Sequence, residues 1–125
     1  QVRENIIFFL FLSANYSQQK GDTFMESKKK FAMMIMGQQY QTKTDYAVLE
    51  TDAVETHIIT VNSPQQAIAV AEELAQAGFG AIEVCGAFGK ELAQKMYEAT
   101  GKTVSVGYVV CPPEQKELSD RFWAE

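Results

Sequence analysis

The chain has few of the residues on which metal sites and disulfide scaffolds depend. Its 125 residues include 2 cysteines, Cys85 and Cys111, and 1 histidine, His57. Structural zinc typically takes about four Cys or His ligands at short paired spacings, so we predict no metal site. One possible disulfide in a chain that is 46% hydrophobic is not the framework of a stapled mini-protein. The scarcity of cysteine therefore favours a cytoplasmic protein, in which thiols stay reduced.

Basic charge and long apolar runs are also scarce. The formal net charge is -5, with acids and bases mixed along most of the chain, so the sequence lacks the basic surface that nucleic-acid binding requires. The basic cluster of Lys28, Lys29 and Lys30 is interpreted as a solvated lead-in to a strand. The apolar run at residues 6–12 is much shorter than the roughly 20 residues that cross a bilayer. We expect neither nucleic acid nor a membrane as a partner.

The first 24 residues differ from the rest. Arg3, the apolar run "IIFFLFL" and the "SA" after it loosely fit a signal peptide. Alternatively, residues 1–24 are translated upstream sequence, because "QQKGD" can be encoded by CAA-CAA-AAA-GGA-GAT, which contains a purine-rich ribosome-binding sequence before Met25. We favour the second interpretation, in which this leader is non-native or disordered and a single domain spans residues 25–125.

What is present is the composition of one globular domain with regular punctuation. The apolar run at residues 31–36, ended by Gly37, is typical of a strand buried on both faces. The runs "YAVLETD" and "ETHIITV" are short and β-prone, and we predict that they pair as a hairpin. Two further strands are predicted at "GAIEVCG" and "TVSVGYVV".

Three helices are expected between and after these strands. The first begins at the cap Ser63, where Pro64 and Gln66 complete a Ser-x-x-Gln capping box. The second carries an apolar stripe and an ion pair between Glu91 and Lys95. Its stripe consists of Phe88, Leu92 and Met96. The third follows Pro112 and Pro113, and is expected to turn Leu118 and Phe122 inward while Glu117 and Arg121 pair outward.

Alternation of strands and helices at this spacing predicts right-handed βαβ crossovers. The predicted fold is therefore α/β: a single layered domain with a mixed sheet of about five strands, the last three parallel (βαβαβα), and helices packed on the sheet.

Ligands of open parallel sheets bind beyond the carboxyl ends of the strands, where helix N-termini present free N–H groups. This rule selects the residues that follow the last three strands. They are Asn62, Ser63, Cys85, Gly86, Ala87, Phe88, Gly89 and Cys111. Gly86 and Gly89 permit a tight turn and close approach of a ligand to the backbone. A plain structural turn and an anion cradle both remain open, because "GAFG" lacks the spacing of known phosphate-binding loops.

Two residues of this region are candidates for catalysis. Cys85 precedes a helix N-terminus, where the dipole favours a thiolate, so it could act as a nucleophile or redox thiol. Glu83 lies two residues earlier and is expected on the same strand face, where it could serve as an acid or base. The alternatives are a small buried hydrophobe for Cys85 and a structural hydrogen bond or oligomer contact for Glu83.

His57 is interpreted as a structural histidine with a satisfied side chain. Parallel strands would place it at the opposite edge from Cys85, which argues against a Cys-His pair. Its expected partner is Asp45 or a neighbouring chain.

At "MMIMG", "ETDAVETHIITV", "GFGAIEVCGAFG" and "VSVGYVV" the chain resembles a family of short bacterial and fungal proteins, domain of unknown function 6506. The resemblance covers about Phe31 to Phe122. It implies a small α/β protein and brings no activity, cofactor or catalytic residue. One departure is Ala53, where glycine is expected in the hairpin turn.

Three functions follow from these observations. The leading hypothesis is a small α/β protein that binds a small polar or anionic metabolite at the carboxyl edge, with no cofactor assigned. The alternatives are an enzyme that uses Cys85 with Glu83, and a structural or interaction module without a ligand. A homo-oligomer is expected, because about 100 residues bury a limited core and the aromatic residues need cover.

Overall fold

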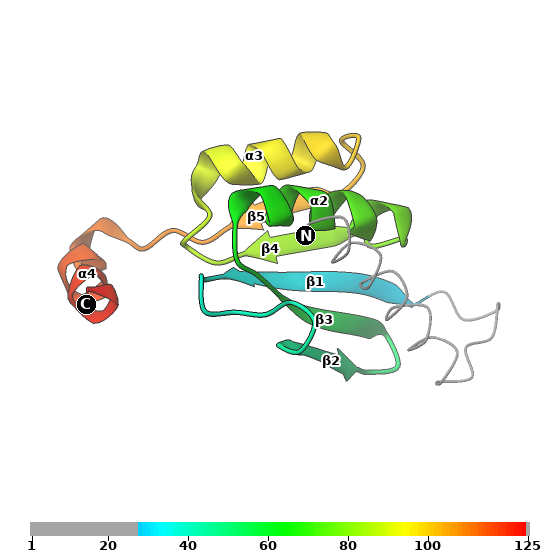
Figure 1. The fold of residues 1–125 in the computed structure, drawn as a ribbon, viewed down its shortest axis with the longest axis horizontal. Helices are drawn as coiled ribbons and strands as arrows, with labels where there is room; N and C mark the ends of the chain where they lie inside the picture. The colour runs from blue at the N-terminus through cyan, green and yellow to red at the C-terminus, as the bar shows by residue number, and fades with distance from the viewer. Residues whose placement is uncertain (1–27, 125) are drawn as a thin grey trace.

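The computed structural model describes residues 28–124, which form one five-stranded sheet in the order β2-β3-β1-β4-β5 (Figure 1). The strands are β1 (Lys29–Met36), β2 (Tyr46–Glu50), β3 (Val54–Val61), β4 (Ala81–Val84) and β5 (Ser105–Tyr108). Strand β1 pairs in parallel with β3 and β4, β4 pairs in parallel with β5, and β2 is an antiparallel edge strand. The predicted α/β class and mixed sheet are confirmed. The interpretation of residues 1–24 lies outside the described residues.

The helices are α2 (Pro64–Gln76), α3 (Gly89–Ala99), the short 3₁₀ turn η1 (Pro113–Gln115) and α4 (Lys116–Trp123). Helix α2 connects β3 to β4 and must pass β1, which lies between those strands; α3 connects β4 to β5 (Figure 1). Within residues 28–124, no helix combines the length and apolar character needed to traverse a bilayer.

Burial alternates along the strands. On β1, Ala32 and Met34 are fully buried, and the parallel register places them beside the buried His57 and Ile59 of β3. The intervening side chains of β1, beginning with Phe31 and Met33, are only half-buried. Successive side chains of a strand point to opposite faces, so the sheet has one covered face and one open face. The core and helices α2 and α3 lie on the covered face, and no described helix lies on the open face.

The start of α2 confirms one half of the predicted capping box. The Ser63 hydroxyl accepts a hydrogen bond from the backbone N–H of Gln66 at 3.1 Å. The reciprocal bond reaches one residue further back than expected, because Gln66 Oε1 accepts from the N–H of Asn62 at 2.8 Å. The helix is therefore capped by two side chains, and its first turn is fixed to the end of β3.

The β2–β3 hairpin is confirmed, and its turn works without the expected glycine. The Thr51 hydroxyl accepts hydrogen bonds from the N–H groups of Ala53 and Val54 at 3.2 and 3.1 Å. Lys102 is the one non-glycine residue with positive φ among residues 28–124, so Ala53 is unstrained. The threonine side chain holds the turn, and glycine is not needed at Ala53.

The expectation for the last helix is wrong. Leu118 and Phe122 are 64% and 75% exposed, and no residue of α4 is buried. The ion pair of this helix joins Lys116 to Asp120 at 2.6 Å, in place of the predicted pair of Glu117 and Arg121. Figure 1 shows the physical reason: α4 stands at the end of an extended segment, away from the sheet, so it has no inward side.

Candidate functional site

The candidate site lies at the carboxyl edge of the sheet, at the boundary between β1 and β4. These strands are neighbours, and their outgoing connections diverge: the loop after β1 leads to β2, and α3 after β4 leads to β5 at the other side. Divergent connections of neighbouring parallel strands mark the position where open α/β sheets bind ligands. The loop begins at Gly37 and the turn at Cys85, whose N–H donates to the Met34 carbonyl at 3.1 Å. This hydrogen bond therefore joins the carboxyl ends of β1 and β4.

The structure separates the predicted site residues into two groups. Asn62 and Ser63 follow β3, whereas Cys85 to Gly89 follow β4, and β1 lies between these strands. Neighbouring strands are about 4.8 Å apart, so the groups stand roughly 10 Å from each other. Sequence reasoning placed these residues at one edge of the sheet but could not place β1 in the middle of that edge.

Asn62 and Ser63 belong to a buried polar network. Ser63 caps α2, and Gln66, which is 2% exposed, accepts from Asn62. The Thr42 hydroxyl lies 2.7 Å from the Thr60 carbonyl oxygen and 3.0 Å from Gln66 Oε1, and its single proton serves one of them at a time. These side chains already have hydrogen-bond partners within the protein, so Ser63 and Gln66 have a structural role.

The same network fixes the loop between β1 and β2. The Asp45 carboxylate accepts from the N–H of Gln41 at 2.8 Å, and the Thr60 hydroxyl donates to the Asp45 carbonyl oxygen at 2.9 Å. The Asn62 amide donates to the Tyr40 carbonyl at 3.5 Å. The loop that follows β1 is thus held to the end of β3 by hydrogen bonds.

On the β4 side of the boundary lies the turn from β4 into α3. Phe88 is 6% exposed and anchors the turn in the core, and its N–H donates to the Cys85 carbonyl at 3.1 Å. Gly89 has φ +77°, a conformation that side chains rarely adopt. Phe88 stands at the N-cap of α3 and offers no side-chain hydrogen bond. The first N–H groups of α3 therefore have no side-chain cap.

There is room beside this turn. A Cβ added at Gly86 would lie 3.9 Å from its nearest neighbour, the carbonyl oxygen of Val109. Gly86 and Ala87 are exposed. A small group could approach the backbone here without displacing a side chain.

The two candidate catalytic residues do not face each other across a pocket. Cys85 is half-buried and packs against the core, while Glu83 is exposed on the open face. Cys111 is exposed in the segment after β5, and both cysteines are free thiols. Because Glu83 is exposed, the cost of burying a lone carboxylate does not arise.

His57 has partners that the sequence reading missed. Its Nε2 lies 2.6 Å from Glu55 Oε2, its Nδ1 contacts the Tyr46 hydroxyl, and Phe79 stacks edge-on at 4.9 Å between centroids. Burial lowers the pKa of His57, and the hydrogen bond to Glu55 opposes this. In the neutral ring Nε2–H donates to the carboxylate, so Nδ1 accepts from Tyr46.

One part of this cluster could have been found from the sequence. Glu55 and His57 are two residues apart on a strand, which puts both side chains on one face. The contact with Tyr46 could not have been found from the sequence, because the position of Tyr46 depends on the hairpin register. The expected partner Asp45 instead binds its own loop.

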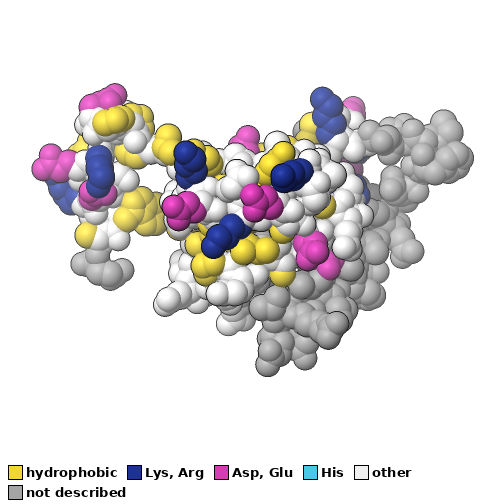
Figure 2. All heavy atoms as spheres, turned by 90° about the horizontal axis from the view of Figure 1, so that it is seen from above, with side chains coloured by type: hydrophobic (Ala, Val, Ile, Leu, Met, Phe, Trp, Pro, Cys, Tyr) yellow, Lys and Arg dark blue, Asp and Glu magenta, His cyan; other side chains and the backbone are white. Residues whose placement is uncertain are grey.

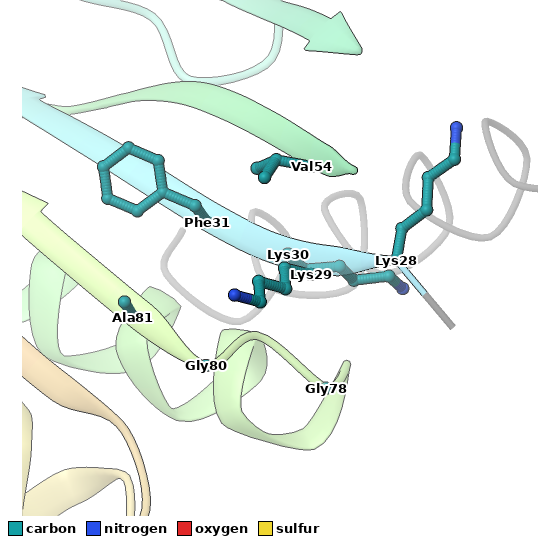
Figure 3. Close-up of a pocket in the computed structure, with 8 residues that line it drawn as sticks. All are labelled: Lys28, Lys29, Lys30, Phe31, Val54, Gly78, Gly80 and Ala81. Atoms are coloured by element: carbon teal, nitrogen blue, oxygen red, sulfur yellow. The ribbon is translucent and has the colours of Figure 1, made fainter. Parts of the chain in front are cut away.

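A pocket of about 610 Å³ lies at the opposite, amino edge of the strands, lined by Lys28, Lys29, Lys30, Phe31, Val54, Gly78, Gly80 and Ala81. Figure 3 shows the three lysine side chains pointing in different directions. Lys28 pairs with Glu50, and Lys30 donates to the Ala77 carbonyl at 3.3 Å. The ammonium groups do not converge on one point, so the pocket does not form an anion site.

Within residues 28–124, no three His, Cys, Asp or Glu side chains gather where they could hold a metal ion. Comparison with known families gives a match over residues 29–124 with one described as "Family of unknown function (DUF6506)". The chain belongs to this family. The resemblance seen in the sequence is thereby confirmed, and membership in DUF6506 assigns no activity. Neither the curated proteins nor the solved structures contain a match.

Proposed function

We propose that this DUF6506 protein binds a small polar or anionic metabolite at the boundary between the carboxyl ends of β1 and β4. The observation that carries the proposal is the uncapped N-terminus of α3 at the point where the connections of β1 and β4 diverge. Helix N-termini attract anions through free N–H groups and the helix dipole.

The turn suits a ligand held by backbone groups. Gly86 and Gly89 carry no side chain that would block approach to the N–H groups of α3. Lys90, the second residue of the helix, is exposed and adds a positive charge nearby. On the β1 side of the boundary, Gln38 and Gln39 are exposed amides that could bind a polar group.

We propose binding without catalysis. Cys85 packs against the core, as a small hydrophobe does, and Glu83 points to the open face of the sheet. This arrangement supports a binding protein more than a thiol enzyme.

The test is a thermal-shift screen of the full chain against phosphorylated, carboxylate and nucleotide metabolites. A ligand that binds the folded state at about 100 times its Kd stabilises it by roughly 2.7 kcal/mol. We expect a hit that is lost in Gly86→Val, whose branched side chain would occupy the space beside the turn from β4 into α3. The matched control is Gly80→Val, at the other end of β4, where an added Cβ meets nothing within 4 Å.

Two outcomes would count against the proposal. One is a screen without hits on a protein that melts cooperatively. The other is a hit that Gly86→Val retains in full, which would place binding elsewhere in the molecule.

A further inference from the structure

The C-terminal segment carries large apolar side chains that are exposed to solvent. Among residues 28–124, all the exposed large hydrophobic side chains but Leu49 come from residues 108–123. They are Tyr108, Val109, Val110, Leu118, Phe122 and Trp123. Figure 2 shows this segment standing apart from the body, with hydrophobic side chains on its surface. We call residues 110–124 the arm.

Helix α4 has the pattern of a helix made to pack. Leu118 and Phe122 are one turn apart, and Trp123 contacts Phe122 with ring centroids 4.9 Å apart. The polar side carries the Lys116–Asp120 ion pair. Leu118 and Phe122 share one side of this eight-residue helix, and Trp123 lies about a quarter turn further round at its end. Large apolar groups are costly to leave in water, so the helix is expected to bind an apolar surface.

The open face of the sheet is such a surface. Its centre is formed by half-buried side chains of β1 and β3 and by Leu49 of β2, which is 60% exposed. The central residues are Phe31, Met33, Ile35, Val54 and Ile58, with the half-buried Thr56 between Phe31 and Leu49. No described helix lies on it, whereas α2 and α3 occupy the covered face. In the part of the chain that the structure describes, the body thus has an apolar sheet face on which no helix lies, and the arm has an apolar helix without a sheet.

The short connection between β5 and α4 disfavours a return of the arm to its own sheet. Val109 is the last residue bonded to β4, through the Val84 carbonyl at 3.2 Å. Cys111 and Pro112 both precede prolines, which restricts them to extended backbone, and Pro112 has ψ 145°. The short connection therefore directs α4 outward past the carboxyl edge (Figure 1). Reaching its own open face would need a reversal at residues that resist one.

We propose that α4 packs on the open face of a second copy of this chain, in a reciprocal exchange of arms that closes a dimer. A reciprocal contact uses the same two surfaces in both copies, so it ends at two chains and leaves neither arm exposed. Each arm buries two aromatic side chains and a leucine, and the two contacts together bury on the order of 1,500 Å², the size of a standard stable interface.

Charge fits the same arrangement. Glu83 is exposed on the open face beside Met33 in the strand register. Arg121 lies next to Phe122 and flanks the apolar side of α4. Packing of the helix over β1 would bring the guanidinium toward the carboxylate and away from bulk water.

The first experiment measures the mass of the full chain in solution by light scattering. We expect a dimer for the native chain and a monomer for Phe122→Asp. Phe122 is 75% exposed, so this substitution leaves the fold of the body intact, which a cooperative melt checks. Lys116→Gln, on the polar side of the same helix, is the matched control and is expected to remain a dimer.

A mixing experiment separates arm exchange from pairing of two arms. Met33→Arg blocks the open face but keeps the arm, and Phe122→Asp does the reverse. Alone, each variant is expected to be monomeric and folded. Mixed, they are expected to form a heterodimer that is weaker than the native dimer, because the arm of the first fits the face of the second and the other contact is lost.

Three results would overturn the proposal. The native chain could be monomeric, Phe122→Asp could remain dimeric, or a folded Met33→Arg could dimerise as well as the native chain. The last result would mean that the arms pair with each other. Loss of metabolite binding would leave the proposal intact, since the carboxyl edge and the open face are different surfaces.

Discussion

The two faces of the sheet carry similar side chains but differ in what lies against them. On β1, Met33 and Met34 are neighbours of the same type; Met34 is fully buried under the helices, and Met33 is half-buried on the open face. Composition along a strand therefore does not tell which face becomes the core. Crossover helices decide it, and α2 and α3 both lie on one side.

The largest predicted effect compares these two methionines. Met34→Ala removes a fully buried side chain and leaves a cavity, so we expect a loss of about 2–5 kcal/mol in the free energy of unfolding. Met33→Ala is expected to cost below about 1 kcal/mol, because its side chain already meets water. Urea denaturation measures both, in the Phe122→Asp background so that no arm covers Met33. Equal losses would show that the open face is as well packed as the covered one.

A second prediction sharpens the comparison at the covered face. Gln66→Leu removes the acceptor used by Asn62 and leaves buried polar groups unpaired, so we expect a loss of about 1–3 kcal/mol. Gln65→Leu, an exposed neighbour in the same helix, is expected to change stability little. Chemical denaturation compares the two. If Gln65→Leu is as damaging, the polar network is not what fixes this turn.

A third prediction concerns pH. Burial lowers the pKa of His57 below its usual 6.5. Above pH 6.5 the ring is neutral whether the chain is folded or unfolded. As the pH falls below 6.5 the unfolded chain takes up the proton first, so stability declines until the pH passes the folded pKa, by at most about 1.4 kcal/mol per pH unit.

His57→Gln isolates this contribution, since the other titrating groups remain. The difference between the native and variant pH profiles of urea midpoints is expected to be flat above pH 6.5 and to slope below it. A difference without slope would mean that Glu55 offsets the effect of burial and that the pKa of His57 is the same in the folded and unfolded chain. A slope of the opposite sign would mean that Glu55 holds the imidazole charged in the fold.

The smallest effect is expected in the arm. Lys116 and Asp120 form an ion pair with both side chains largely exposed, where solvent screens the attraction. Lys116→Gln should leave the thermal melting curve of the body unchanged. A clear drop in melting temperature in the Phe122→Asp background, where no arms are exchanged, would show that α4 stabilises its own body, contrary to the separation of the two regions.

Local signals in the sequence predicted much of this fold, and long-range pairing explains what they missed. The cap at Ser63, the hairpin and the stripe of Phe88 and Met96 depend on residues close in sequence, so they could be found. The position of β1 between β3 and β4 depends on partners tens of residues away. That insertion separated Ser63 from Cys85 and divided the predicted site.

The same distinction explains the arm. The spacing of Leu118 and Phe122 correctly indicated an amphipathic helix, and the wrong step was to assume an inward side. Amphipathicity states that a helix needs an apolar partner but not where that partner is. Two prolines had marked the break, since residues before proline stay extended, and their effect on direction becomes visible only with β5 in place.

By itself, the sequence determined the elements and their order along the chain, because turn residues, caps and hydrophobic periodicity act over a few residues. Tertiary structure alone decided which sheet face is covered, which strands are neighbours at the carboxyl edge, and that α4 finds no place on its own body. Those outcomes depend on the path of each crossover over the sheet. That path is fixed by packing between distant segments, and no local pattern encodes it.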